Sequence, residues 1–171
     1  MIRRVLAPLL SLVCLVALAS CNDSGGGSDA PKTVDGIPAY AAANTEKGAQ
    51  NFARYWVDVL NKATVTGDTK KLESLQKDSC EGCKVFTDRL NAIYQAGGHV
   101  ETKGFNVKTL LTDSSIPKPG AGVSATLTAT PQTVVEKKGA KPTKRPGGDV
   151  RVRLIMVREN DHWVMDRIDL G

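Results

Sequence analysis

The sequence is poor in the residues that most often build metal and catalytic centres. It has two histidines in 171 residues, His99 and His162, and no phosphate-binding loop or catalytic triad is evident. Structural zinc sites usually take their ligands as two close pairs. The spacing of these histidines does not indicate such a site, even with Cys80 and Cys83 added. We therefore expect no metal and no cofactor, and we interpret both histidines as exposed residues at strand starts.

No apolar run in the sequence has the length of a stable membrane span. The most apolar one, Val5 to Ala19, is shorter than the roughly 20 residues that a spanning helix needs, and Pro8 and Ser11 interrupt it. Two arginines precede the run, and small residues followed by a cysteine end it, which is the layout of a secretory signal peptide. We expect residues 1–20 to be removed on export.

The end of this run, Leu18-Ala19-Ser20-Cys21, resembles the lipobox of bacterial lipoproteins. The resemblance implies that Cys21 receives a diacylglyceryl group and becomes the new N-terminus. Two acyl chains hold a protein stably on a membrane, because each buried CH₂ adds about 0.8 kcal/mol, so the expected location is the extracytoplasmic face of the cell membrane. The alternative is an ordinary cysteine behind a cleavable signal. Arg3-Arg4 raises the twin-arginine route, but the neighbouring residues favour the general secretory route.

The charge balance and the length exclude two further classes of protein. The chain has 23 basic and 18 acidic residues, and loss of residues 1–20 leaves 21 basic ones, a net charge of +3. A nucleic-acid-binding protein usually has a strongly basic stripe, so we expect no nucleic-acid partner. The remaining length suits one domain and is too short for a two-lobed solute-binding protein.

Composition divides the exported part at about residue 44. Residues 21–43 combine the lipidated cysteine with a stretch rich in Gly, Ser, Ala, Pro and Asp, which predicts a flexible tether. From Asn44 the apolar residues follow spacings of three and four, which predicts an amphipathic helix capped by Asn44 or Thr45. We therefore expect a single folded domain over residues 44–171.

Two more helices are predicted before the pattern changes. The break Thr66-Gly67-Asp68 precedes a short helix. Asp78 and Glu81 resemble a capping box at the start of a third helix, and Gly97-Gly98 predicts its end.

After Gly98 the apolar residues alternate with polar ones, which is typical of strands. The turn Glu159-Asn160-Asp161 joins the last two strands into a hairpin. Three helices followed by four antiparallel strands indicate an α+β fold, with the helices covering one face of a single sheet. The predicted strands span residues 99–111, 123–130, 150–157 and 163–170.

Residues 44–171 resemble the cone-shaped nuclear transport factor 2-like superfamily, in particular small actinobacterial lipoproteins that carry such a domain. The resemblance rests on a long first helix with Phe52 and Trp56, the break at residues 66–68, the Cys80-Glu81-Gly82-Cys83 turn and a last strand reading His162-Trp163-Val164-Met165. It implies three helices packed on a curved four-stranded sheet. It also implies a pocket between them, which enzymes, binding proteins and scaffolds of the superfamily use alike. The fold therefore does not decide the function.

Several aromatic residues are candidates to line that pocket, although such spacings more often indicate simple core: Trp56, Phe86, Tyr94, Phe105 and Trp163. An isomerase or dehydratase would also place a carboxyl group and hydrogen-bond donors inside the cone. Tyr94, Asp166 and Asp169 have suitable chemistry, but we interpret the two carboxylates as surface groups. The sequence favours a non-catalytic binding or interaction module at the cell envelope, with such an enzyme as the alternative.

A basic segment between two predicted strands is the second candidate surface. It contains Lys137, Lys138, Lys141, Lys144 and Arg145. Pro142 and Pro146 oppose regular structure, so we predict a solvated hairpin loop. The functional alternative is contact with an anionic surface, either membrane lipid or a cell-wall polymer. An envelope protein also remains open as a partner.

Cys80 and Cys83 are the cysteines that remain once Cys14 leaves with the signal and Cys21 takes up lipid. Disulfides persist in an exported compartment, so we predict that the two pair with each other. A C-x-x-C pair at a helix start also occurs in thiol–disulfide oxidoreductases. In those proteins the pair follows a strand in a βαβ pattern, whereas a helix precedes it here. We therefore predict a structural role.

Overall fold

A long amphipathic helix lies at the centre of the fold. The computed structural model describes residues 32–171, and its longest helix is α2 (Glu46–Thr66). Thr45 is the N-cap, because its Oγ1 accepts a hydrogen bond from the Gly48 N–H at 2.9 Å. The predictions of this helix and of its cap are confirmed. The predicted signal peptide, the lipidation site Cys21 and the start of the predicted tether lie outside the described residues.

The other helices are α1 (Ala39–Ala42), α3 (Lys70–Glu73) and α4 (Glu81–Gln95). The predicted capping box at the start of α4 is wrong. Cys80 is the N-cap of this helix, and its Sγ accepts a hydrogen bond from the Cys83 N–H at 3.3 Å. Asp78, which the capping box would make the N-cap, therefore lies two residues before the observed N-cap.

The folded part begins earlier than the composition predicted. Strands β1 (Thr33–Val34) and β2 (Ile37–Pro38) form a small hairpin, and Ile37 is fully buried. The indole N–H of Trp163 donates a hydrogen bond to the Ala43 carbonyl oxygen at 2.9 Å. The prediction of a flexible tether is therefore wrong for residues 33–43. The Ala43 carbonyl oxygen thus has a partner that lies 120 residues away in the sequence.

The seven strands that follow α4 form two antiparallel sheets. The four-stranded sheet has the order β4-β5-β8-β9, and the three-stranded sheet has the order β3-β6-β7. Asn160 and Asp161 join β8 to β9 with φ values of +45° and +64°, which confirms the predicted hairpin. The strands are β3 (His99–Thr102), β4 (Phe105–Asp113), β5 (Ala121–Ala129), β6 (Gln132–Val135), β7 (Thr143–Arg145), β8 (Gly148–Glu159) and β9 (His162–Leu170).

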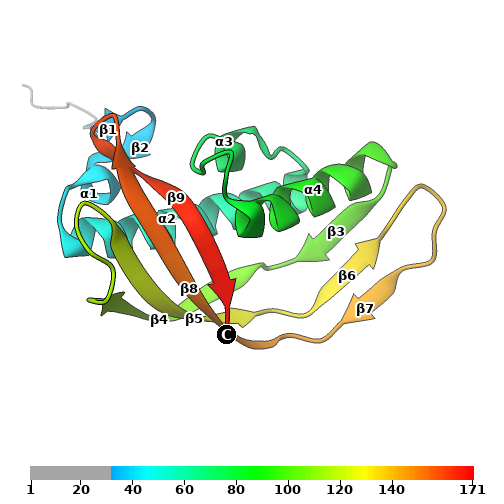
Figure 1. The fold of residues 1–171 in the computed structure, drawn as a ribbon. Helices are drawn as coiled ribbons and strands as arrows, with labels where there is room; N and C mark the ends of the chain where they lie inside the picture. Colours follow the sequence, from blue (N-terminus) through cyan, green and yellow to red (C-terminus); the bar gives the residue numbers. More distant parts are fainter. Residues whose placement is uncertain (1–31) are drawn as a thin grey trace, which may run out of the picture. The chain divides into compact units, whose positions relative to one another are not determined.

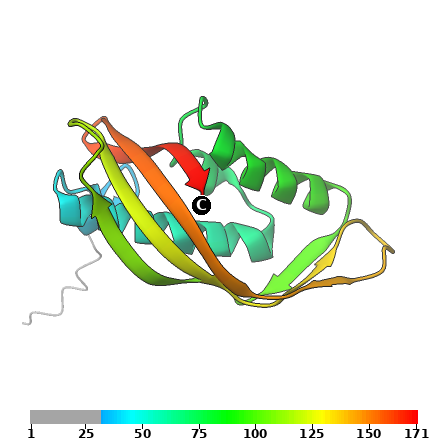
Figure 2. The ribbon, with the colours of Figure 1, turned by 60° about the horizontal axis from the view of Figure 1, so that its bottom comes forward.

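The two sheets are separated by interruptions that fall at the same level on three chain segments. Lys103-Gly104 separates β3 from β4, Thr130-Pro131 separates β5 from β6, and Pro146-Gly147 separates β7 from β8. The Thr130 N–H donates to the Gly104 carbonyl oxygen at 3.0 Å across this line, which we call the bend line. Figure 2 shows all three segments continuing through it from one sheet to the other. The prediction of a single sheet is wrong, because proline supplies no N–H to the strand ladder and glycine permits the turn.

The helices cover the inner face of the four-stranded sheet (Figure 1). Helix α2 packs against β4 and β5, and α4 packs against β9. The Trp56 and Phe86 rings from these two helices meet edge to face, with centroids 6.0 Å apart. The α+β prediction is confirmed at this level. Within residues 32–171, no helix has both the length and the apolar character to cross a membrane.

Gly104 is expected to be the more sensitive of two glycines with nearly equal backbone angles. Gly104 has φ +80° and Gly139 has φ +77°. A Cβ on Gly104 would lie 2.3 Å from Asn61 Oδ1, whereas nothing lies within 4 Å of a Cβ on Gly139. Asn61 would then lose its hydrogen bonds to the Phe105 N–H and carbonyl oxygen, which measure 2.8 and 2.9 Å.

We expect Gly139→Ala to lower the free energy of unfolding by about 1–2 kcal/mol, the cost of a left-handed backbone. Gly104→Ala should have the same backbone cost and lose about 1 kcal/mol more for each of the two hydrogen bonds of Asn61. We therefore expect it to lower the free energy of unfolding by about 3–4 kcal/mol. Urea denaturation of both variants measures the difference. Equal losses would show that the bend line does not depend on the Asn61 contact.

Candidate functional site

An apolar pocket lies where the bend line meets the helices. Its volume is about 260 Å³, and its walls come from α2, α4 and the strand segments on both sides of the bend. Gly104, Phe105, Ala129 and Thr130, which flank the bend, all line it. The pocket therefore exists because the two sheets meet at an angle over α4. Its apolar walls are formed by Leu60, Phe86, Leu90, Ile93, Val100 and Phe105.

The mouth of the pocket carries two arginines from opposite walls. Arg89 comes from α4 and Arg145 from β7, and both line the pocket. Their guanidinium groups contact the same carboxylate oxygen, Glu136 Oε1, with a distance of 3.6 Å for Arg145. Val85 lies one helical turn before Arg89 and is 66% exposed. The described part of the chain supplies no Asp, Glu, His, Cys or Tyr to the pocket lining.

The structure separates the five aromatic candidates. Phe86 and Phe105 line the pocket. Trp56 is buried in the core behind Phe86. The Tyr94 hydroxyl donates to the Thr64 carbonyl oxygen at 2.8 Å and accepts from the Val100 N–H at 3.3 Å, so it ties three elements together. Trp163 contacts the N-terminal segment at Ala43 instead.

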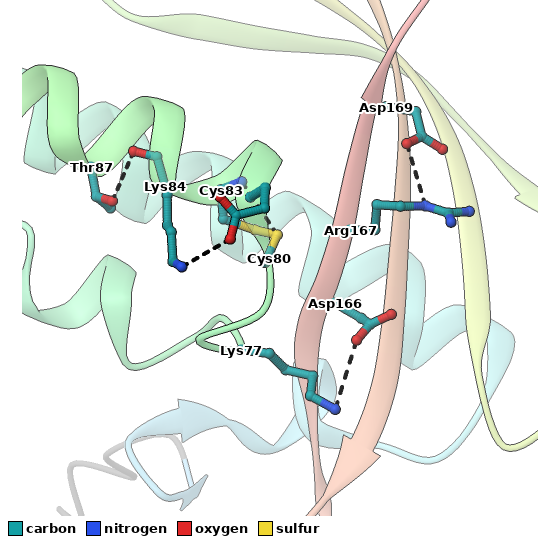
Figure 3. The surroundings of a disulfide bond; sticks show 9 residues. Lys77, Cys80, Cys83, Lys84, Thr87, Asp166, Arg167 and Asp169 are labelled. Atoms are coloured by element: carbon teal, nitrogen blue, oxygen red, sulfur yellow. Dashed lines mark hydrogen bonds and ion pairs between the residues drawn. A yellow bond between two sulfur atoms is a disulfide. The ribbon is translucent and has the colours of Figure 1, made fainter.

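The candidate carboxylates do not converge on the pocket. Asp166 lies 3.7 Å from Lys77 Nζ, and Asp169 lies 3.3 Å from Arg167 Nε (Figure 3). Neither carboxylate lines the apolar pocket, and neither does Tyr94. Each candidate is therefore held in a separate contact.

The two histidines occupy different environments. His99 is exposed, with Nε2 3.5 Å from Glu101 Oε1. The prediction that His162 is exposed is wrong, because its Nδ1 lies 3.2 Å from Asp35 Oδ2 and the ring is buried under the N-terminal segment. Over residues 32–171, no three His, Cys, Asp or Glu side chains are grouped to hold a metal ion.

The basic segment is partly a strand. Thr143–Arg145 forms β7, paired with β6, so the prediction of a loop is wrong for Lys144 and Arg145. The Lys138 N–H donates to the Ala96 carbonyl oxygen at 2.9 Å, which fixes the segment against the end of α4. Among the residues described, its four lysines form no ion pair, and Arg145 pairs with Glu136. Sequence reasoning missed Arg89 and Glu136, because their pairing joins residues that lie 47 positions apart in the sequence.

The disulfide closes the first turn of α4. Cys80 and Cys83 are bonded, with Cα atoms 5.2 Å apart, and both residues are at most 1% exposed. The pair lies at the start of α4, on a helix that packs against β9 (Figure 3), and Gly82 approaches the Ile168 carbonyl oxygen there. Thiol–disulfide exchange requires a thiolate to reach one of the sulfurs. The burial of both cysteines therefore favours the structural role.

The largest pKa shift lies elsewhere, at the turn between β4 and β5. The Ser115 hydroxyl and N–H donate to Asp113, and Arg153 contacts the same carboxylate. These contacts lower the pKa of Asp113 to about 2. None of the three residues lines the apolar pocket. The contacts tie the turn to β8.

Comparison with known proteins shows a family and a fold. The sequence matches the family of unknown function DUF6318 over residues 31–169. No curated protein matches it. The intermembrane space region of the chloroplast protein ARC6 is 15% identical, with coverage of 74% of this chain and 95% of that chain and a TM-score of 0.51. At this identity the likeness shows a shared fold alone.

Two bacterial structures are also similar. An uncharacterised protein with a cystatin-like fold from Caulobacter vibrioides is 13% identical, with coverage of 72% of this chain and 90% of that chain and a TM-score of 0.46. An NTF2-like protein with a cystatin-like fold from Novosphingobium aromaticivorans is 10% identical, with coverage of 71% and 79% and a TM-score of 0.43.

A double replacement of Cys80 and Cys83 by Ser tests the structural role of the disulfide. Closing a loop of four residues stabilises by about 2 kcal/mol in the chain-entropy estimate, which corresponds to a fall in Tm of roughly 5–10 °C for a domain of this size. Thermal unfolding followed by circular dichroism measures it. We also expect the folded wild type to resist reduction by glutathione at neutral pH. Ready reduction without loss of Tm would indicate a working redox pair instead.

Proposed function

This chain belongs to DUF6318, a family of unknown function, and we propose that it is an exported lipoprotein whose folded part is a non-catalytic binding module. The observation that carries the binding role is the apolar pocket of about 260 Å³ on the bend line. A concave apolar site with a few polar groups at its mouth is the usual form of a small-molecule site. Membership of the nuclear transport factor 2-like superfamily is part of the proposal, supported by helices on the inner face of a curved antiparallel sheet.

The chemistry of the pocket supports binding over catalysis. An acid–base enzyme needs a proton donor or acceptor within hydrogen-bond reach of its substrate. The titratable side chains in this lining are Arg89 and Arg145, and arginine does not lose its proton in proteins. Asp166 and Asp169 contact Lys77 and Arg167 instead.

The cell envelope is the proposed location. Leu18-Ala19-Ser20-Cys21 supports attachment through a lipid on Cys21, and the proposed site of attachment is the extracytoplasmic face of the membrane. The four lysines at 137, 138, 141 and 144 are exposed, which supports contact with anionic lipid or a cell-wall polymer. Each basic residue close to an anionic membrane contributes about 1 kcal/mol.

Replacing Cys21 tests the anchor, and Cys14 provides a matched control within the same N-terminal region. We expect an alkyne-tagged fatty acid fed to cells to label the wild type and the Cys14→Ala variant. Cys21→Ala should lose the label and leave the membrane fraction, because the thioether has no sulfur to form on. Gel fluorescence after fractionation reads both outcomes. Undiminished labelling of Cys21→Ala would refute the lipoprotein assignment.

Two exposed valines test whether the pocket is occupied. Val85 lines the pocket mouth and is 66% exposed, whereas Val65 lies at the end of α2, is 47% exposed and does not line it. We expect Val85→Trp to reduce the organic-soluble small molecules that copurify with the chain several-fold, because the indole covers the mouth. Val65→Trp should leave them unchanged. Mass spectrometry of extracts quantifies both, and equal amounts in all three proteins would contradict a binding role for the pocket.

A further inference from the structure

We propose that the pocket takes a monoanionic amphiphile, namely a short apolar chain whose carboxylate lies between Arg89 and Arg145. The inference rests on the proposed binding function of the same pocket and adds the chemical class of its ligand. It follows from the polarity of the walls, the size of the cavity and the charge at its mouth.

The walls and the size require the apolar chain. Phe86, Leu90 and Phe105 form the inner surface, and no wall residue among those described offers a carboxylate that would favour a cationic or sugar-like ligand. A volume of about 260 Å³ lies near the lower end of the roughly 300–1,000 Å³ that small-molecule sites span. This space suits a single apolar chain of moderate length.

The mouth requires a single negative charge. Arg89 and Arg145 bring two positive charges from opposite walls, and Glu136 returns one negative charge. One surplus positive charge is therefore left beside an apolar cavity. The side chains of Arg89 and Arg145 are 47% and 49% exposed, so a ligand can reach them from solvent.

The geometry of the two guanidinium groups favours a carboxylate. Each guanidinium has five N–H donors in a rigid planar fork, which matches the two oxygens of a carboxylate. Arg89 and Arg145 contact one oxygen of Glu136, so donors remain for a second carboxylate. Glu136 already shows that both arginines converge on one carboxylate oxygen.

Glu136 therefore acts as a competitor for the ligand. Its carboxylate occupies the donors that the ligand's headgroup would use, and binding must shift or share this contact. Removing the charge with Glu136→Gln raises the surplus at the mouth from one to two positive charges. The proposal thus predicts that this variant binds the anionic ligand more tightly, an effect opposite in sign to that of the arginine variants.

Photo-crosslinking on the full-length chain tests the proposal. The probe is a ten-carbon fatty acid with a diazirine at its far end, added at pH 7.5 to whole lysates that contain the chain. The matched probes are the corresponding alcohol, the trimethylammonium compound and the alkyl phosphate, each with the same diazirine. After irradiation the chain is purified under denaturing conditions, and mass spectrometry quantifies labelling of the peptides that carry Phe86 and Phe105.

The expected result is that the carboxylate labels these peptides about two- to fivefold more than the alcohol, as one partly exposed charged contact allows. Arg89→Gln and Arg145→Gln should remove this excess, and Glu136→Gln should increase it. Arg54→Gln is the matched control, because Arg54 is exposed on α2 and does not line the pocket. Should an arginine variant not fold, Val85→Glu provides a second way to cancel the surplus positive charge. Val85 is exposed on α4, one turn from Arg89.

The outcomes separate this inference from the proposed function. Equal labelling by the carboxylate and the alcohol would overturn the ligand class while leaving an apolar binding pocket. Preference for the phosphate over the carboxylate would overturn the monoanionic assignment and indicate a lipid headgroup. Preference for the trimethylammonium probe would overturn the charge argument. The absence of labelling by every probe at both peptides would overturn the pocket-binding function itself.

Discussion

The bend line is the constraint on which the remaining structure depends. Three chain segments cross from one sheet to the other at the same level, at Gly104, Thr130-Pro131 and Pro146-Gly147. Proline cannot donate to a strand ladder, and the left-handed backbone at Gly104 leaves no room for a Cβ beside Asn61. Beside Gly104, Asn61 pairs with both backbone groups of Phe105, the first residue of the edge strand β4. A residue of α2 is thereby hydrogen-bonded to the chain at the point where the sheet turns.

The pocket and its charged mouth follow from that turn. Because the three-stranded sheet is angled against the four-stranded sheet, residues of β6, β7 and α4 line one pocket together with Phe105. The same approach brings Arg145 within reach of Glu136 and Arg89. An unbent sheet would carry β7 away from α4, so one backbone feature produces both the cavity and its surplus charge.

The domain is secured at other places by contacts that do not involve the pocket. The disulfide closes the start of α4 beside β9. The N-terminal segment covers His162 and takes the indole hydrogen bond of Trp163. Asp113, with its lowered pKa, ties the β4–β5 turn to Arg153 on β8. None of the residues in these contacts lines the pocket. At its mouth the two arginines pair with Glu136.

The sequence by itself determined the features that depend on neighbours along the chain. Apolar spacing and a Thr45 cap predicted α2, and Asn160-Asp161 predicted the last hairpin. The expectation that Cys80 and Cys83 are the cysteines left after export predicted their pairing. The helix and the hairpin depend on interactions within a few residues. The cysteine pairing was predicted because each of the two cysteines has no other cysteine left as a partner, so the sequence alone suffices. The candidate site was predicted only in part, since Phe86, Phe105 and Arg145 were singled out but in separate groups.

The tertiary structure alone decided the features that depend on distant partners. Composition placed residues 33–43 in a tether, because a window average cannot show that Ile37 and Ala43 meet a core that includes Trp163. Periodicity predicted one strand over residues 99–111, since the alternation continues through Gly104 while the ladder partner changes from β6 to β5. The pairing of Arg89 with Glu136 joins residues 47 positions apart. Its physical cause is the angle between two sheets, a quantity that no local pattern of residues encodes.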